Sequence, residues 1–326
     1  EGPRGLAYDA SSGKLYVADP PGRRVHSYEL QARRCTASNC QLDYELVVGG
    51  SHVVVAEDVV SSWVWVDGDG SLYFTDQVAK TVNRISRTVL DRLASKALQS
   101  SDLKTVSELE LHALTGAVSA AVTDVARRRA RAALDRELRA AIVALHEAEG
   151  GANVGTPGGV LSEGPVVYWT NQVEGLTKGS LAAGSSDVEE SAGAHKTLAV
   201  SSIADAAYGV ASTFSKILFA GDRCLYSVSK ASRATSVVSE AVTSPRGMVW
   251  DGDSTVYVAD MGGDAIYSLA SGRDGPNQPL QEVAGFPRPF GLALLRPADL
   301  PRLLDAAAAV DAAAGAASSW WPSWLR

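Results

Sequence analysis

The chain has 326 residues, of which 46% are apolar and 21% are charged, and its formal net charge is −7. Disordered and collagen-like chains have other compositions, so this is a globular protein. The acidic balance excludes the basic surface that nucleic-acid binding requires. The sequence has no run of about 18 apolar residues that could span a membrane, and its three cysteines are too few for a disulfide scaffold.

The N-terminal stretch predicts a unit of four antiparallel strands. Residues 3–19 read PRGLAYDASSGKLYVAD, in which a glycine leads an apolar strand, a turn follows, and a second alternating strand closes with Asp. Such turn residues favour tight connections between antiparallel strands. Third and fourth strands are predicted over residues 25–30 and 44–48.

Two cysteines lie between the third and fourth of these strands. Cys35 and Cys40 enclose four residues, and a loop this short could close as a local disulfide in an oxidising compartment. Two free thiols on a surface loop are the alternative, and the sequence leaves both open. Cys224 lies in an apolar run and is predicted to be a core residue.

A second unit begins at Trp63 and reads WVWVDGDGSLYFTD, with a further strand over residues 82–85. Its segment Asp67–Gly70 resembles part of a calcium-binding loop. The later acidic ligand is missing at the required spacing, and the segment stands where a hairpin needs its turn. We therefore predict a turn there and no metal site.

The strand pattern stops between residues 86 and 156, where Ala, Leu, Arg and Glu are abundant. These residues favour helices, so the segment is predicted to be an α-helical insertion. A first helix, capped by Ser86 or Thr88, is expected to end near residue 99.

The second helix of this insertion is predicted from about residue 105 to residue 149, and a break at Gly116 is left open. Its apolar stripe recurs at helical spacing and includes Ile142 and Leu145. Two helices joined in this way predict a hairpin that protrudes from the second unit, because the segment is too long for an ordinary loop.

Four arginines crowd one turn of the predicted hairpin: Arg127, Arg128, Arg129 and Arg131. A solvated helix face would explain them, and the alternative is a docking surface for an acidic partner or an anionic lipid. Neighbouring acidic residues offset this charge, which weakens the case for lipid or nucleic acid. Arg127, Arg128 and Arg131 are therefore candidate contacts to a protein partner.

The unit then recurs along the rest of the chain. Residues 245–260 read PRGMVWDGDSTVYVAD, weaker copies occupy residues 159–171 and 209–222, and a last strand begins at residues 290–295. The first strands of these units start near residues 5, 63, 159, 209, 247 and 291. Where no insertion intervenes, the spacing is about 38 to 44 residues, which is typical of propeller blades and not of sandwiches.

The units resemble known repeats. PRGLAYD with LYVAD, and PRGMVWD with VYVAD, resemble NHL repeats, whereas LYFTD at residues 72–76 and VYWTN at residues 167–171 resemble YWTD repeats. Both families are propellers, usually with six blades. The resemblance implies an all-β propeller over residues 1–85 and 157–295, with six blades of which the last is incomplete; five blades are the alternative.

A further resemblance is to the gluconolactonase and strictosidine-synthase-like propellers. Glu1-Gly2-Pro3 resembles the unit whose Glu binds the metal in that family, and Glu163-Gly164-Pro165 repeats it. At the later ligand positions this chain has Tyr208 and Arg246, which cannot replace an oxygen ligand of a hard cation. The resemblance therefore implies a propeller without the catalytic metal ligands, without a cofactor and without enzymatic activity. A metal-dependent lactonase or esterase is the alternative.

The polar residues that close the second strands recur with the repeat: Asp19, Asp76, Asn171 and Asp260. A catalytic residue is not expected in every blade. We predict that these side chains bond to blade backbone at strand ends.

The C-terminal segment, residues 296–326, is predicted to form a short helix and a tail rich in tryptophan. Trp320, Trp321 and Trp324 stand among the last seven residues. Tryptophan anchors protein interfaces and also suits a membrane surface. The three side chains are candidate anchors to a partner, with peripheral membrane contact or packing on the chain itself as alternatives.

These features together predict a non-catalytic interaction scaffold, an extrinsic accessory subunit of a larger, membrane-associated complex. The partners are other protein subunits, and no nucleic acid is expected. We also expect the chain to lie in an extracytoplasmic space or an organelle lumen. This expectation rests on the start at Glu1, which a removed leader would explain, on the cysteine pair and on the tail. The thylakoid lumen and a photosystem are the narrowest version of this expectation.

Overall fold

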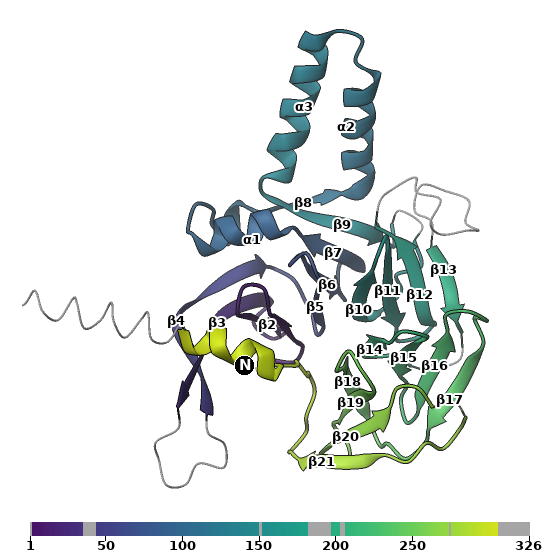
Figure 1. Cartoon of the computed structure of the whole chain (residues 1–326). Coiled ribbons are helices and arrows are strands. Elements are labelled where there is room, and N and C mark those ends of the chain that lie inside the picture. Colours follow the sequence, from purple (N-terminus) through teal and green to yellow (C-terminus); the bar gives the residue numbers. More distant parts are fainter. Residues whose placement is uncertain are drawn as a thin grey trace, which may run out of the picture.

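The computed structural model shows a β-propeller with a helical hairpin that stands away from it (Figure 1). The described residues are 2–34, 44–149, 152–181, 197–202, 206–273 and 275–305. None of the described helices is long and apolar enough to cross a membrane.

Within the described residues the chain forms five blades, each with four antiparallel strands in chain order. Blade 1 comprises β1 (Leu6–Asp9), β2 (Lys14–Asp19), β3 (Arg24–Arg34) and β4 (Tyr44–Glu57). Blade 3 comprises β10 (Pro157–Glu163), β11 (Val166–Asn171), β12 (Gly175–Ser180) and β13 (Thr197–Ser201). Blade 4 comprises β14 (Val210–Ser212), β15 (Lys216–Ala220), β16 (Leu225–Ser229) and β17 (Thr235–Ser239). Blade 5 comprises β18 (Pro245–Trp250), β19 (Thr255–Asp260), β20 (Ala265–Ala270) and β21 (Gln281–Gly285).

Blade 2 carries the insertion. Its strands are β5 (Val64–Val66), β6 (Leu72–Asp76), β7 (Thr81–Ile85) and β9 (Ala141–Glu147), and β8 (Lys104–Ser107) adds a fifth strand parallel to β9. Between β7 and β9 lie α1 (Arg87–Ala94), the 3-10 turn η1 (Ser100–Asp102), α2 (Glu108–Ala120) and α3 (Asp124–Leu138). The helical hairpin is therefore α2 and α3, and the chain returns from it directly into the outer part of the blade.

The structure corrects the predicted helices. Ser86 caps α1 as expected, since its side chain accepts a hydrogen bond from the Val89 backbone, but α1 ends at Ala94. The second helix is wrong at both ends, because residues 104–107 form β8, and Ile142 and Leu145 lie in β9. Pairing of β9 with β7 completes blade 2, and this tertiary pairing overrides the helix propensity of the segment.

The break in the hairpin also differs from the prediction. Gly116 lies inside α2, and the helices separate instead at residues 121–123. Thr123 caps α3, because its side chain accepts the Ala126 N–H at 3.2 Å.

Four apolar cores lie between successive blades, as strand alternation requires. One joins blades 1 and 2 around Tyr16 and Phe74, and another joins blades 2 and 3 around Trp169. A third joins blades 3 and 4 around Phe219, and a fourth joins blades 4 and 5 around Val258. Between blade 5 and blade 1 the described residues form no such blade-to-blade core.

A sixth position of the ring lies between blades 5 and 1 and holds only an extended segment, residues 290–295, which we call the sixth segment. The predicted sixth blade is therefore wrong in the described residues, and five blades are correct. A Cβ added to Gly247 would lie 2.3 Å from the carbonyl oxygen of Phe290, and one added to Gly291 would lie 2.1 Å from that of Arg4. Glycine thus lets the backbone of the sixth segment close the ring between the two flanking blades.

The segment after residue 295 turns away instead of pairing. It forms the 3-10 turn η2 (Pro297–Asp299) and a helix over residues 300–305, which confirms the short C-terminal helix. Leu303 is buried against Leu30 and Ala32 of blade 1, and in Figure 1 this yellow helix lies beside β2 and β3. The helix therefore covers one part of the blade 1 face that a sixth blade would otherwise cover.

Candidate functional site

Aromatic rings gather near the centre of the ring, where the first strands begin, and we call this place the aromatic mouth. The rings of Trp63 and Phe290 have centroids 5.3 Å apart, and those of Trp63 and Tyr208 are 6.3 Å apart. The Arg4 guanidinium lies 5.4 Å from the Phe290 ring centroid, and that of Arg246 lies 3.7 Å from the Tyr208 centroid. Each guanidinium thus makes a cation–π contact with one ring, and Trp63 lies between the two rings that carry them.

Two polar groups of this mouth are held away from water. Burial lowers the pKa of the Arg246 guanidinium, while Tyr208, Asp222 and Asp260 act in the opposite direction. The group nevertheless stays protonated near neutral pH. Trp63 is only 8% exposed, and its Nε1 has no hydrogen-bond partner among the described residues.

The side chains of this mouth are not those that a divalent cation prefers. Hard cations take carboxylate, carbonyl or water oxygens, whereas this cluster offers guanidiniums, indole, phenol and a phenyl ring. Glu1 lies outside the described residues. Glu163 lies at the end of β10, where it pairs with Lys230 and accepts a bond from Ser212. No cluster of three or more His, Cys, Asp or Glu side chains that could hold a metal occurs in the described part of the chain.

The recurring polar residues bond to backbone, as predicted. Asp260 accepts the Thr243 and Ser244 N–H groups at 2.8 and 2.6 Å, and it is almost fully buried. The same role is seen in the other blades: Asp76 accepts the N–H groups of Val78 and Ala79, Asp19 that of Gly22, and Asn171 that of Gly155. Asp19 and Asp76 thus hold the turns that follow their strands, whereas Asn171 and Asp260 hold the segments that lead into the first strands of their blades.

A cavity of about 390 Å³ lies at the opposite ends of the first strands. Blades 1, 2 and 5 and the sixth segment all line it, with Tyr8, Trp65, Val249 and Leu294 among the apolar and aromatic walls. The hydroxyl of Tyr8 and the Nε1 of Trp65 are buried without a hydrogen-bond partner among the described residues. Burial, with Asp299 and Asp9 nearby, raises the pKa of Tyr8.

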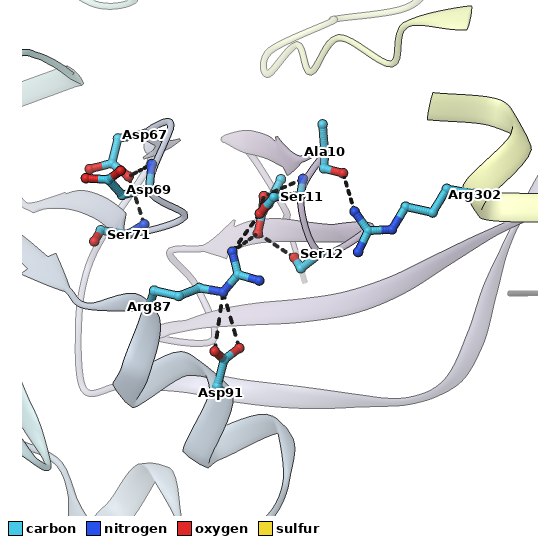
Figure 2. A network of polar contacts seen from close by, with 10 residues as sticks. Ala10, Ser11, Ser12, Asp67, Asp69, Ser71, Arg87, Asp91 and Arg302 are labelled. Atoms are coloured by element: carbon cyan, nitrogen blue, oxygen red, sulfur yellow. Dashed lines mark hydrogen bonds and ion pairs between the residues drawn. The ribbon is translucent and has the colours of Figure 1, made fainter. Parts of the chain in front are cut away.

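A polar network borders this cavity (Figure 2). Asp9 accepts bonds from the hydroxyls of Ser11 at 2.6 Å and Ser12 at 2.5 Å, and Arg87 of α1 approaches it at 3.6 Å. Arg87 also contacts Asp91 one turn further along α1. Burial alone would raise the pKa of Asp9, but these hydrogen bonds and the Arg87 charge outweigh burial and lower it. The network thus ties the first turn of blade 1 to the first helix of the insertion.

The Asp67–Gly70 segment of Figure 2 is a hairpin turn, as predicted. Asp67 accepts the N–H groups of Asp69 and Ser71, both at 2.9 Å, and the hydroxyl of Tyr73 at 2.9 Å. Gly70 has a φ of 79°, which glycine adopts without strain. The Asp67 carboxylate oxygens, which a calcium site would use, therefore hold this turn. Burial raises the pKa of the Tyr73 hydroxyl to about 12.

The predicted arginine contacts lie on α3. Arg127 pairs with Asp124 at 3.5 Å, and Arg131 pairs with Asp135 at 3.5 Å, each within the helix. Arg128 donates to the carbonyl of Asp124. The three side chains and Val118 of α2 line a shallow open groove between the two helices. The structure thus brings Arg127, Arg128 and Arg131 together on one exposed surface.

The hairpin also exposes apolar side chains near its tip. Val122 is 93% exposed and Val125 is 56% exposed, and no described side chain of α3 is buried. In Figure 1 the two helices project from the side of blade 2 without lying on another blade.

Several predicted site residues are not brought to these places. Cys35, Cys40, Trp320, Trp321 and Trp324 lie outside the described residues. The prediction that Cys224 is a core residue is wrong, since it lies half-buried in the turn between β15 and β16, where its apolar run ends.

Sequence reasoning found Tyr208 and Arg246 at the aromatic mouth but missed Arg4, Trp63 and Phe290. A signal was available, because Arg4, Tyr208, Arg246 and Phe290 each precede the glycine that leads a first strand. Trp63 lacked this signal, since the residue that follows it in blade 2 is Val64 and not glycine. The polar network around Asp9 had no signal in the spacing, because Arg87 approaches from the insertion.

No protein-family model and no curated protein matches the sequence. The structure is similar to a chain of a nidogen/laminin complex, with 10% sequence identity and a TM-score of 0.53, over 89% of this chain and 84% of that one. It is also similar to a gluconolactonase from Xanthomonas campestris, with 10% identity and a TM-score of 0.50, over 89% of this chain and 78% of that one. At this identity the similarity shows a shared fold and no shared function, and the chain is thus a β-propeller of five described blades.

Proposed function

We propose that this chain is a non-catalytic scaffold that binds other protein subunits through the α2–α3 hairpin. The observation that carries the proposal is the exposure of Val122 and Val125 on an element that leaves the propeller core. Helices of this length are marginal in water by themselves and gain stability chiefly from packing. A hairpin that leaves its outer faces uncovered is best explained by a partner that covers them.

The charge of α3 narrows the partner. The helix carries five arginines against three acidic residues in a chain whose net charge is −7. A partner with an apolar patch bordered by acidic side chains would match Val122, Val125 and the arginines of the groove. In this complex Arg127, Arg128 and Arg131 are secondary contacts to the acidic side chains of the partner.

The narrower role is that of an extrinsic subunit of a membrane-associated complex in an organelle lumen. It depends on Cys35, Cys40 and the tail tryptophans, so it stays a prediction. A chain that ends at residue 317 tests the tail. Loss of the partner on purification would support Trp320, Trp321 and Trp324 as anchors, and a partner that still co-purifies would show that they are not anchors.

The hairpin is tested by cross-linking in cells of the native source. A photo-reactive residue at position 122 is expected to capture one distinct protein, whereas the same residue at position 78 captures none of it. Val78 is a matched control, because it is an exposed valine of the propeller, at 66%. Replacement of Val122 and Val125 by Ser should lower co-purification at least tenfold without changing the fold. A chain that elutes as a free monomer from gently lysed cells would contradict the scaffold function.

A further inference from the structure

The sixth position of the ring has a first strand without a second. In each of the five blades the first strand pairs with the next strand along the chain, for example β1 with β2 and β18 with β19. The sixth segment has the same apolar pattern, FGLALL, and occupies the equivalent place beside Gly247 and Gly5. It is therefore a first strand by position, but it has no partner strand in the described chain.

The backbone of the sixth segment is correspondingly unbonded. None of its N–H or C=O groups, from Phe290 to Leu295, takes part in a hydrogen bond with another described residue. Bonds resume only at its ends, where Arg288 donates its N–H to Asp264 and Arg296 donates its N–H to Asp299. Unpaired peptide groups of an extended segment are a template for an added strand.

The two flanking blades leave apolar faces at this position incompletely covered. Strand pairing places Leu6, Tyr8, Leu15, His26 and Tyr28 on the face of blade 1 that looks toward the sixth segment. It places Val249, Tyr257 and Ile266 on the facing side of blade 5. All eight side chains are half-buried, whereas the opposite face of blade 1 is buried against blade 2. The helix over residues 300–305 covers only the part around Tyr8, Leu15 and Leu30.

Positive charge surrounds this position. Arg4 and Arg288 lie at one end of the sixth segment, and Arg296 and Arg302 follow its other end. None of the four forms an ion pair with another residue in the described ranges. Two acidic residues there, Asp264 and Asp299, accept backbone N–H groups instead. Arg4 and Arg302 do donate to Ser62 and to the Ala10 carbonyl, but guanidiniums without a carboxylate partner at both ends of the segment favour a negatively charged occupant.

We propose that the sixth position binds an extended, acidic segment of a partner polypeptide, which pairs antiparallel with residues 290–295 as the second strand of a sixth blade. Its alternate apolar side chains pack between Tyr28 and Tyr257, and its acidic ends meet Arg288 and Arg296. Such strand addition takes affinity from backbone bonds and specificity from side-chain pockets.

The tail of the chain itself matches this occupant poorly. Residues 306–326 contain one acidic and one basic residue, so they offer no net charge to the arginines. They are rich in alanine, which favours helix over strand, and Pro322 cannot donate to a ladder.

This inference rests on the proposed interaction function, but it concerns a surface separate from the hairpin. The probe is a synthetic fluorescent peptide that copies β19, Thr255–Asp260, with two glutamates added at each end. Saturable binding to the full chain is expected by fluorescence anisotropy. Lysines in place of the glutamates, or a proline at its centre, should each weaken binding at least tenfold.

Two charge-reversed variants locate the binding. Arg288→Glu with Arg296→Glu should weaken peptide binding at least tenfold, because both guanidiniums are exposed and their replacement spares the core. The matched control is Arg223→Glu with Arg273→Glu, two exposed arginines of blade 4 and of the loop in blade 5. Val122→Ser with Val125→Ser should bind the peptide like the wild type, so failure of the hairpin function leaves this test intact.

Amide hydrogen exchange identifies the occupant. In the free chain the amides of residues 291–295 should exchange rapidly, and the peptide should slow them at least tenfold. Slow exchange in the free chain at every concentration would show that the chain fills the position itself, and slow exchange only at high concentration would show a second copy. Either result would overturn the proposal, as would the absence of peptide binding up to about 1 mM.

Discussion

The two faces of blade 1 contain the same strands but differ in what covers them. On one face Tyr16, Ala18 and Val25 are buried against Leu72 and other residues of blade 2. On the other face Leu30 is buried under the C-terminal helix, but Leu15 and Tyr28 are only half-buried. Strand alternation makes both faces apolar, so the neighbour and not the pattern determines which face becomes core.

The incomplete ring can be stable because most of its apolar area is buried elsewhere. Burial of apolar area drives folding, and four blade-to-blade cores provide it without a sixth blade. At the sixth position the backbone of the sixth segment packs closely against the flanking blades at Gly247 and Gly291, but little apolar area is buried there. Substitutions on the two faces should therefore differ in their effect on the free energy of unfolding.

The largest effect is expected at the covered face. Leu72→Ala should lower the free energy of unfolding by about 2–5 kcal/mol, because the side chain is fully buried and leaves a cavity. Leu15→Ala, at the other face, should cost about half as much, since its environment is partly solvent. Urea unfolding at constant m-value measures both. Equal losses would mean that the sixth position is covered as fully as a blade interface.

Closure of the ring is the next test. Gly291→Ala should destabilise the chain by about 1–3 kcal/mol, since its new Cβ would lie 2.1 Å from the Arg4 carbonyl oxygen. Gly272→Ala is the control, because no atom lies within 4 Å of the added Cβ. A Gly291→Ala variant as stable as the control would show that the sixth segment does not close the ring.

Much of this fold could be predicted from the sequence, because repeated turns and strand alternation are local. The units at residues 3–19 and 245–260 predicted blades 1 and 5 closely. The number of blades was not predictable in the same way. The sequence pattern of residues 290–295 is that of a first strand whether or not further strands pair with it. The strand β9 was also missed, because AIVALHE has the apolar spacing of a helix and only pairing with β7 decides it.

The candidate site was less predictable for a physical reason. The aromatic mouth and the Asp9 network each join residues from different blades, and spacing within one unit cannot reveal such contacts. That Asp260 bonds to backbone was predictable, because a polar residue at a strand end bonds to nearby peptide groups, but its partner Thr243 ahead of β18 was not. The arginines of α3 were predictable as a cluster, but not as the wall of a groove with Val118.

A smaller, pH-dependent effect is expected where blade 1 meets the insertion. The Asp9 pKa is lowered in the folded chain relative to an unfolded value of about 3.9, so the charged carboxylate stabilises the fold. That contribution is complete above about pH 5 and is lost as the pH falls through the folded pKa. Asp9→Asn should therefore cost about 1 kcal/mol at neutral pH, with the difference from the wild type shrinking below about pH 4.

Urea midpoints of both proteins measured between pH 7 and pH 3 check this prediction. Asp251→Asn is the comparison, because backbone hydrogen bonds from Asp253 and Thr255 also oppose burial and lower the pKa of Asp251, but no arginine charge contributes to that shift. A difference between Asp9→Asn and the wild type that stays constant down to pH 3 would contradict the assigned role of the carboxylate.

The smallest effect is expected on the incompletely covered face itself. The Tyr28 ring stacks on His52 at 5.5 Å and is half-buried, so Tyr28→Ala should change the free energy of unfolding by less than about 1 kcal/mol. The same substitution should abolish much of the stabilisation that the acidic peptide gives, because ligand binding to the folded state raises the unfolding midpoint. Thermal unfolding with and without peptide separates the two effects. A Tyr28→Ala variant that unfolds as readily as Leu72→Ala would show that this face is already core in the free chain.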